Sequence, residues 1–148
     1  MQDRYLCKAR PIGTRKQWVT GFCAVLGEKT VIIVNEPEKF YDVDSGKNSH
    51  GNKIVEVIPK TVCWCTGLKD KNGRVIWEND IVNGIIKRGA AFYRCLVLWN
   101  ECKARFDVRA MGCNFPMTLD ECTDDISMSG FEYEVVGNVF DNPELLEV

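Results

Sequence analysis

Histidine is almost absent from this chain of 148 residues, where His50 is the only one. His50 lies in a polar, glycine-containing stretch, Asp44–Asn52, that we expect to be a loop and therefore a poor place to hold a catalytic base rigidly. The chain also lacks a phosphate-binding Gly-x-x-x-x-Gly-Lys-Ser/Thr loop, a His-Glu-x-x-His motif and a dinucleotide fingerprint. We therefore expect a protein that is not an enzyme and that needs no cofactor.

Long hydrophobic runs are absent as well. The longest one, Val31–Val34, is far too short to cross a membrane. The first residues, Met1–Tyr5, are polar and charged, and no apolar stretch of signal-peptide length follows them. We expect a cytoplasmic protein without a membrane partner, long enough to bury about 68–70% of its unfolded surface in one core or in two small ones.

No Cys-x-x-Cys pair occurs, although the chain has eight cysteines. In a cytoplasmic protein these are best interpreted as reduced thiols. Alternation along a strand places Cys63 and Cys65 on one face, where they serve either as two zinc ligands or as two small core residues. Structural zinc sites usually use paired cysteines with about two to four residues between them, whereas Cys63 and Cys65 are separated by a single residue. We therefore favour the core and expect no metal.

Positive charge is missing from one end of the chain. Residues 1–110 hold all 19 Lys and Arg against 12 Asp and Glu, while residues 111–148 hold nine acids and no Lys or Arg. The net charge of −2 therefore divides into +7 and −9. This asymmetry indicates either a basic binding face or an acidic segment that neutralises the rest, and we favour the second interpretation.

The most informative segment runs from Thr66 to Val82. Asn72 and Gly73 form the strongest short hairpin signal, and we expect a type I′ turn at Asp70–Gly73. A strand with Trp77 follows, and Asn79 and Asp80 then form a second turn before the next strand. Asn72, Gly73, Asn79 and Asp80 are therefore predicted to be structural turn residues.

The order of these residues resembles the central signature of the YopX family, small proteins found in phages and prophages. Its usual form is Thr-Gly-Leu-x-Asp-x-x-Gly-x-x-Ile-Tyr-Glu-Gly-Asp-Ile-Val. The chain agrees with this form at Thr66-Gly67-Leu68, Asp70, Gly73, Ile76, Glu78, Asp80 and Ile81-Val82. Further agreement lies in a closing block and two lead-in segments: Glu134–Leu145, Trp18–Gly21 and Val57–Val62. The resemblance implies a phage or prophage accessory protein, a group with no agreed biochemical role.

Two departures from the family pattern are informative. Asn79 stands where the family usually has glycine, and asparagine is a residue that tolerates a left-handed turn. Cys63 and Cys65 stand where glycine and an aromatic residue are common. The turn should therefore survive, and the two thiols are not required by whatever the family members do in common.

Many short apolar segments separated by turn residues predict a mainly β protein. We expect an N-terminal antiparallel β element (residues 1–60) packed on a C-terminal SH3-like β-barrel (residues 61–148) within a single domain. One or two short helical turns are also expected, after the capping box Thr118–Glu121 and at Pro143–Leu146. The predicted strands are 4–9, 17–26, 30–34, 53–58, 61–65, 81–86, 91–99, 103–108 and 131–140.

Basic residues gather at two predicted turns, beside Trp77. They form our candidate surface for nucleic acid or a protein partner: Lys69, Lys71, Arg74, Lys87 and Arg88. Against this interpretation, Trp77 and Trp99 are more typical of a core, and scattered lysines are usually only solvated.

Two other hypotheses remain. Asp70, Glu78 and Asp80 supply three carboxylates for metal-dependent chemistry on nucleotides or nucleic acid, although Asp70 and Asp80 stand at turn positions where such side chains normally bond their own backbone. The acidic run Asp120–Asp125 either meets a basic partner or is a solvated loop. We favour a binding protein over an enzyme.

Overall fold

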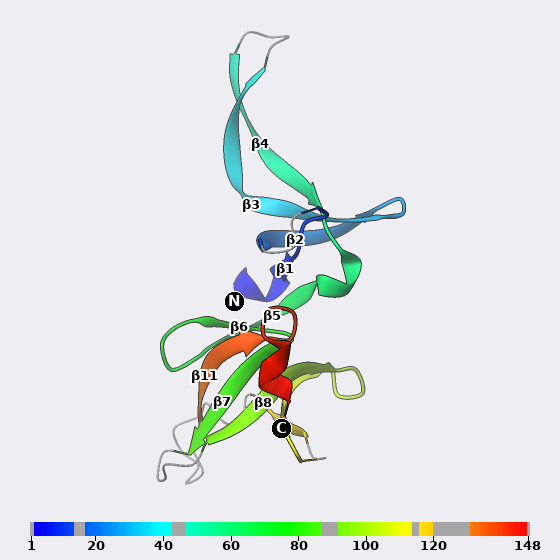
Figure 1. The fold of residues 1–148 in the computed structure, drawn as a ribbon. Helices are drawn as coiled ribbons and strands as arrows, with labels where there is room; N and C mark the ends of the chain where they lie inside the picture. Colours follow the sequence, from blue (N-terminus) through cyan, green and yellow to red (C-terminus); the bar gives the residue numbers. More distant parts are fainter. Residues whose placement is uncertain are drawn as a thin grey trace. The chain divides into compact units, whose positions relative to one another are not determined.

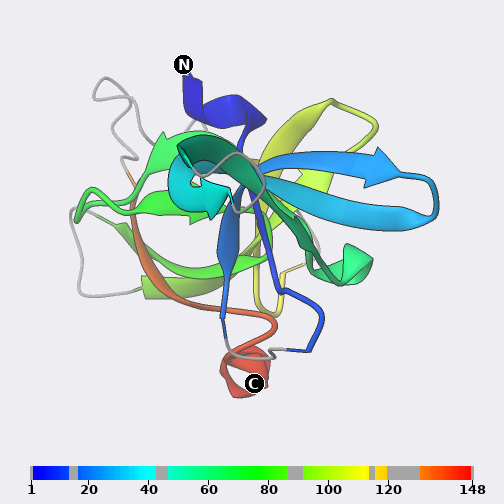
Figure 2. The same ribbon diagram turned by 90° about the horizontal axis from the view of Figure 1, so that it is seen from above.

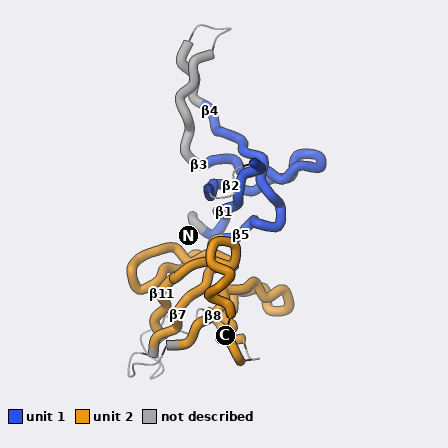
Figure 3. The backbone as a smooth tube through the Cα atoms, in the orientation of Figure 1, with its two compact units in different colours: residues 1–64 blue, residues 65–148 orange. Residues whose placement is uncertain are grey.

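The computed structural model of the chain describes residues 2–13, 17–42, 47–86, 92–113, 116–119 and 131–147. The chain divides into two compact units, Met1–Trp64 (unit 1) and Cys65–Val148 (unit 2), as Figure 3 shows. Each unit has a hydrophobic core of its own. The proposed subdivision of one domain at residues 60 and 61 stays a prediction.

Unit 1 is an antiparallel sheet (Figure 1). Its strands pair in the order β4-β3-β2-β1, and β1 then pairs with the first residues of β5. Each strand pairs with its sequence neighbour from β1 to β4, so the order of this part of the sheet follows the order of the chain. The elements are η1 (Gln2–Tyr5), β1 (Cys7–Ala9), β2 (Val19–Leu26), β3 (Lys29–Asp42), β4 (Lys47–Glu56), η2 (Pro59–Thr61) and β5 (Cys63–Lys69).

The β3–β4 hairpin is longer than the sequence predicted. Glu36–Lys39 does not end the strand, and 47–52, expected to be loop, belongs to β4, while 43–46 lies outside the described residues. Pro37 is tolerated because the β3–β4 register shifts between Ile33 and Pro37, and irregular positions accept a residue without an N–H. Cross-strand pairing therefore overrides the local turn signals.

The core of unit 1 is built from small and β-branched residues. Cys7, Ala9, Ile32 and Val57 are buried, and four partly buried side chains pack against them: Val19, Cys23, Val55 and Val62. Since Cys7 and Ala9 face this core, Lys8 between them faces away from it.

Unit 2 contains an open five-stranded antiparallel sheet in the order β10-β9-β8-β7-β11 (Figures 1 and 2). The remainder of β5 pairs with β6. The SH3-like barrel is not confirmed: the described strands form two antiparallel sheets, and β10 and β11 end the order of the second sheet without pairing with each other. The strands are β6 (Val75–Trp77), β7 (Asp80–Ile86), β8 (Phe92–Asn100), β9 (Arg105–Ala110), β10 (Pro116–Thr118) and β11 (Phe131–Asn138).

The helical elements of the described chain are short. The predicted turn at Pro143–Leu146 is confirmed as the 3-10 helix η4. Thr118 of the supposed capping box ends strand β10 and Leu119 is buried in the core of unit 2, while Asp120 and Glu121 lie outside the described residues. Throughout the part of the chain that the structure describes, no helix has the length and apolar character needed to cross a membrane.

The core of unit 2 lies on one face of its sheet. Cys95 and Val97 of the central strand β8 are buried in it, but Trp99 is 43% exposed and contacts Phe106 edge-on at 4.9 Å between ring centroids. The prediction that Trp99 fills the core is therefore wrong. The buried members are Ile76, Val82, Cys95, Val97, Val108, Ala110, Leu119, Tyr133 and Val135.

Candidate functional site

The signature hairpin closes with a three-residue loop. The Gly73 N–H donates to the Asp70 carbonyl at 2.9 Å, and the Asp70 N–H donates to the Arg74 carbonyl at 2.8 Å. Gly73 has φ of 79°, whereas the non-glycine residues with positive φ in the described chain are Asn79 and Ala104. The expected type I′ turn is therefore wrong, since it also needs a positive φ at Asn72. The observed loop is of the kind that ends in a left-handed glycine.

The Asp70 carboxylate organises this loop and joins it to β11. Its Oδ1 accepts the N–H groups of Asn72 and Arg74, both at 2.9 Å, and its Oδ2 accepts the Val135 N–H at 3.0 Å. Asp70 is only 6% exposed. Burial raises the pKa of this carboxyl, but the three N–H groups and the nearby Arg74 guanidinium outweigh burial and hold the pKa below its usual 3.8.

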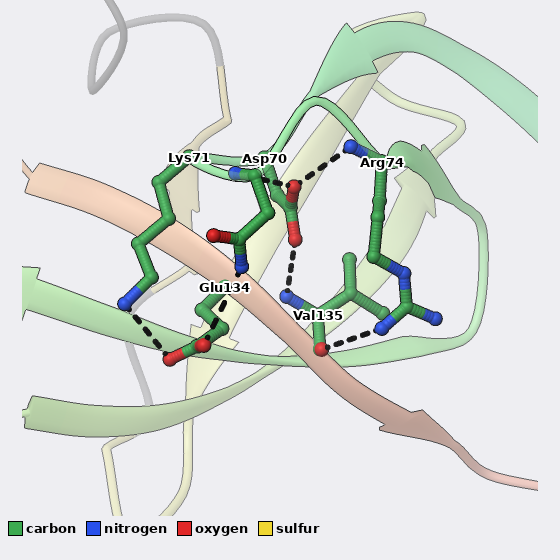
Figure 4. A network of polar contacts seen from close by, with 6 residues as sticks. Asp70, Lys71, Arg74, Glu134 and Val135 are labelled. Carbon is green, nitrogen blue, oxygen red and sulfur yellow. Dashed lines mark hydrogen bonds and ion pairs between the residues drawn. The ribbon is translucent and has the colours of Figure 1, made fainter.

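Two of the basic side chains on this hairpin contact β11 (Figure 4). Lys71 Nζ lies 3.1 Å from Glu134 Oε2, and Arg74 Nη1 donates to the Val135 carbonyl at 3.3 Å. Lys69, Lys71 and Arg74 are all exposed residues. The structure therefore brings Lys69, Lys71 and Arg74 to one hairpin but uses two of them within unit 2. Lys87 and Arg88, the other members of the candidate surface, lie outside the described residues.

The second turn of the signature is also defined by its side chains. Asn79 has φ of 65°, which confirms that asparagine maintains the left-handed turn. Its N–H donates to the Val97 carbonyl at 2.9 Å, and its carbonyl accepts the Val139 N–H at 3.1 Å. The buried Asp80 accepts the Trp77 N–H on Oδ2 at 2.8 Å. Asp80 thus bonds nearby backbone, as the turn position predicted.

Thr66 and Gly67 complete the structural use of the signature. The Thr66 hydroxyl donates to the Ile76 carbonyl at 2.7 Å and accepts the Leu68 N–H at 3.1 Å. Gly67 has φ of 80°, at the point where the β5–β6 register shifts. In the described structure, the polar side chains Thr66, Asp70 and Asp80 of the signature therefore form hydrogen bonds with the backbone and fix its turns.

The three candidate carboxylates do not form a metal site. Asp70 and Asp80 already accept backbone N–H groups. Glu78, two residues before Asp80, is partly buried. Across the described ranges, no group of three or more His, Cys, Asp or Glu is placed to hold a metal ion. The arrangement supports turn formation rather than cation binding.

Cys7, Cys63 and Cys65 are buried thiols. Cys63 and Cys65 are 0% and 2% exposed, and Cys63 Sγ donates to the Thr61 carbonyl at 3.3 Å. Burial, together with the neighbouring Cys23 thiol, raises the pKa of Cys7 to about 12. The Cys7 thiol is therefore protonated at neutral pH and poorly reactive.

Asn138 has a structural role that the sequence interpretation missed. Its Oδ1 accepts the N–H groups of Phe140 and Asp141 at 3.0 and 2.9 Å, and its Nδ2 donates to Asp141 Oδ2 at 2.7 Å. Asparagine followed closely by Asp-Asn-Pro is a turn signal from which this cap could have been inferred.

Unit 1 exposes an apolar row that the sequence interpretation also missed. Phe22 of β2 lies opposite Ile33 of β3, and Ile33 lies opposite Ile54 of β4. Their chain neighbours Cys23, Ile32 and Val55 belong to the core, so the row is on the opposite face of the sheet. Phe22 is 41% and Ile54 is 56% exposed. The continuous apolar character of Val31–Val34 was the available signal for a strand that is apolar on both faces.

A basic and aromatic cluster lies on the same face of unit 1. Lys8 pairs with Thr20, two residues from Phe22 on β2, and both Lys8 and Thr20 face away from the core. Lys8 Nζ lies 5.0 Å and Arg10 Cζ 5.2 Å from the centroid of the Trp18 ring. These distances are those of cation–π contacts. We refer to the surface formed by Lys8, Arg10, Trp18, Phe22, Ile33 and Ile54 as the outer face.

Comparison with known proteins gives a family but no activity. A family model described as YopX protein matches residues 25–147. The match includes the stretches near residues 27–53 and 100–130 that lack recognisable motifs, but it begins after the Trp18–Gly21 segment. Among curated proteins, none matches the chain. Since the match spans most of the 148 residues, the chain belongs to the YopX family.

Proposed function

We propose that this protein is a non-enzymatic accessory factor of a phage or prophage that acts in the host cytoplasm by binding a partner protein. The outer face of unit 1 is the binding surface. The polar residues of the signature support this proposal because they are occupied in shaping turns: Asp70 accepts three backbone N–H groups and Asp80 accepts another. A scaffold of this kind leaves recognition to side chains elsewhere.

The observation that carries the proposal is the exposure of large apolar side chains on one face. Phe22 and Ile54 are 41% and 56% exposed, and Ile33 lies between them. Complete burial of such a side chain is worth about 1.5–3 kcal/mol. Contiguous apolar surface on a protein commonly marks an interaction site.

Nucleic acid is the second candidate partner, favoured by one observation. Lys8 and Arg10 lie beside Trp18, and basic residues next to an aromatic ring are typical of single-strand binding. The signature hairpin adds little to this hypothesis, because Lys71 and Arg74 contact Glu134 and Val135. We therefore place protein before nucleic acid.

Affinity capture from infected or induced host cells tests the proposal. The wild-type chain is compared with a Phe22→Ser/Ile54→Ser variant and with Val25→Ser, whose side chain is 71% exposed but pairs with Thr30 rather than within the apolar row. We expect a stoichiometric protein partner with wild type and Val25→Ser, and its loss with the double variant. An unchanged partner with the double variant, or only nucleic acid that washes off with salt, would contradict the proposal.

A further inference from the structure

We infer that the outer face recognises an acidic, amphipathic peptide segment of its partner, with apolar side chains on the Phe22–Ile33–Ile54 row and carboxylates at Lys8 and Arg10. The inference rests on the proposed binding function and specifies the chemistry of the partner. It follows from the position of the apolar row, from the charges beside it, and from the shape of the side chains involved.

The apolar row defines the first requirement for the ligand. Phe22, Ile33 and Ile54 are directly opposite one another on three adjacent strands. Directly opposite residues on one face of a sheet are close neighbours, so these three side chains form a continuous strip across the strands. A segment that lies along this strip buries apolar side chains against all three residues. The ligand therefore has an apolar side.

The cluster beside the row defines the second requirement. Lys8 and Arg10 are held by the Trp18 ring, at 5.0 and 5.2 Å, on the same face of the sheet as Phe22. Residues 1–64 contain ten Lys and Arg against seven Asp and Glu, so unit 1 has a net charge of +3. A carboxylate that reaches Lys8 or Arg10 forms a charge-assisted contact at the edge of the apolar strip. The ligand is therefore acidic next to its apolar side.

The kinds of side chain favour a peptide over a nucleic acid. Single-stranded nucleic acids bind where successive bases stack on aromatic rings along a basic groove. Here two of the three residues of the apolar row, Ile33 and Ile54, are branched aliphatic residues without a flat surface. The Trp18 ring is already approached by Lys8 and Arg10. Aliphatic surface beside a small cationic cluster complements the side chains of an acidic peptide.

A selection from a displayed library of random peptides tests this inference with the full chain as bait. We expect enrichment of peptides that combine Asp or Glu with large apolar residues. Synthetic versions of the enriched peptides should bind about tenfold or more weakly to Lys8→Gln/Arg10→Gln and to Phe22→Ser/Ile54→Ser, as measured by fluorescence anisotropy. Raising the salt concentration should weaken binding to wild type more than binding to Lys8→Gln/Arg10→Gln.

Matched controls separate the outer face from general effects. Lys60→Gln removes an exposed positive charge of unit 1, and Val25→Ser removes an exposed apolar side chain outside the row. Both should leave peptide binding within about twofold of wild type. Circular dichroism melting of each variant checks that it is folded.

Three results would overturn the inference. They are an absence of enriched peptides, enrichment of basic peptides, and enriched peptides that bind equally to all variants. Tight binding of a single-stranded oligonucleotide that depends on Lys8 and Arg10, with no peptide selected, would assign the face to nucleic acid. A failed selection combined with a captured partner that still requires Phe22 and Ile54 would refute the acidic peptide and leave the proposed function standing.

Discussion

At the scale of single residues, Asp70 links the local turn to the rest of unit 2. It receives hydrogen bonds from Asn72 and Arg74 within the loop and from Val135, which is 65 positions away. Replacing Asp70 by Asn removes the charge and turns one acceptor into a donor that faces an N–H group. We expect Asp70→Asn to lower the free energy of unfolding at neutral pH by about 2–3 kcal/mol, as measured by urea denaturation.

The pH dependence of stability gives a second test of Asp70. Its pKa is lower in the folded chain than in the unfolded one, so its contribution is complete above the unfolded pKa of about 3.9 and is lost as pH falls through the folded value. The difference in unfolding free energy between wild type and Asp70→Asn should therefore shrink below about pH 4. The exposed Glu101→Gln serves as control. A difference that stays constant down to about pH 2 would contradict this role of Asp70.

Asn79 allows a matched pair of substitutions. With φ of 65°, the position favours glycine or asparagine over other residues. We expect Asn79→Ala to cost about 1–2 kcal/mol of unfolding free energy and Asn79→Gly to cost little, as measured by chemical denaturation. Equal losses for the two variants would show that the asparagine side chain, rather than the backbone angle, matters.

At the scale of elements, Gly21 permits the close contact of β2 with β3. A Cβ atom at Gly21 would overlap the Ile33 carbonyl oxygen and carbon, the latter at 2.8 Å. Because backbone cannot move aside as a flexible side chain can, we expect Gly21→Ala to destabilise unit 1 by about 1–3 kcal/mol. Thermal unfolding, with the exposed Thr20→Ala as control, measures this cost. A melting temperature like that of the control would contradict the assigned packing.

Features that depend on neighbouring residues could be predicted from the sequence. They include the left-handed turns at Gly73 and Asn79 and the terminal helical turn at Pro143–Leu146. Features that depend on distant pairing could not be predicted. The passage of β3 through Pro37 requires β4 opposite it, and the bond from Val135 to Asp70 requires β11 beside the hairpin.

The candidate site was less predictable than the turns. Lys71 and Arg74 looked available in the sequence, but β11 provides Glu134 and the Val135 carbonyl as partners. The exposure of Phe22 and Ile54 depends on which face of the sheet the core occupies, and that choice is made by packing rather than by local pattern. Barrel closure likewise depends on pairing between distant strands.

At the scale of the whole molecule, the two units have separate cores. Ile32 in unit 1 and Ile76 in unit 2 are both fully buried, so Ile32→Val and Ile76→Val remove the same group from different cores. Each should cost about 0.5–1.5 kcal/mol. Hydrogen exchange should accelerate mainly within residues 1–64 for the first and within 65–148 for the second. Equal acceleration of both units by both variants would instead show a single cooperative fold.

We propose that the signature hairpin is scaffold and that the outer face of unit 1 is the binding surface. Hydrogen exchange of the full chain, with and without its captured partner, distinguishes these two roles. We expect slower exchange on binding within strands β2 and β3 and in residues 51–56 of β4, with little change at Lys69–Trp77. Protection centred on Lys69–Trp77, with β2 unchanged, would contradict this proposal.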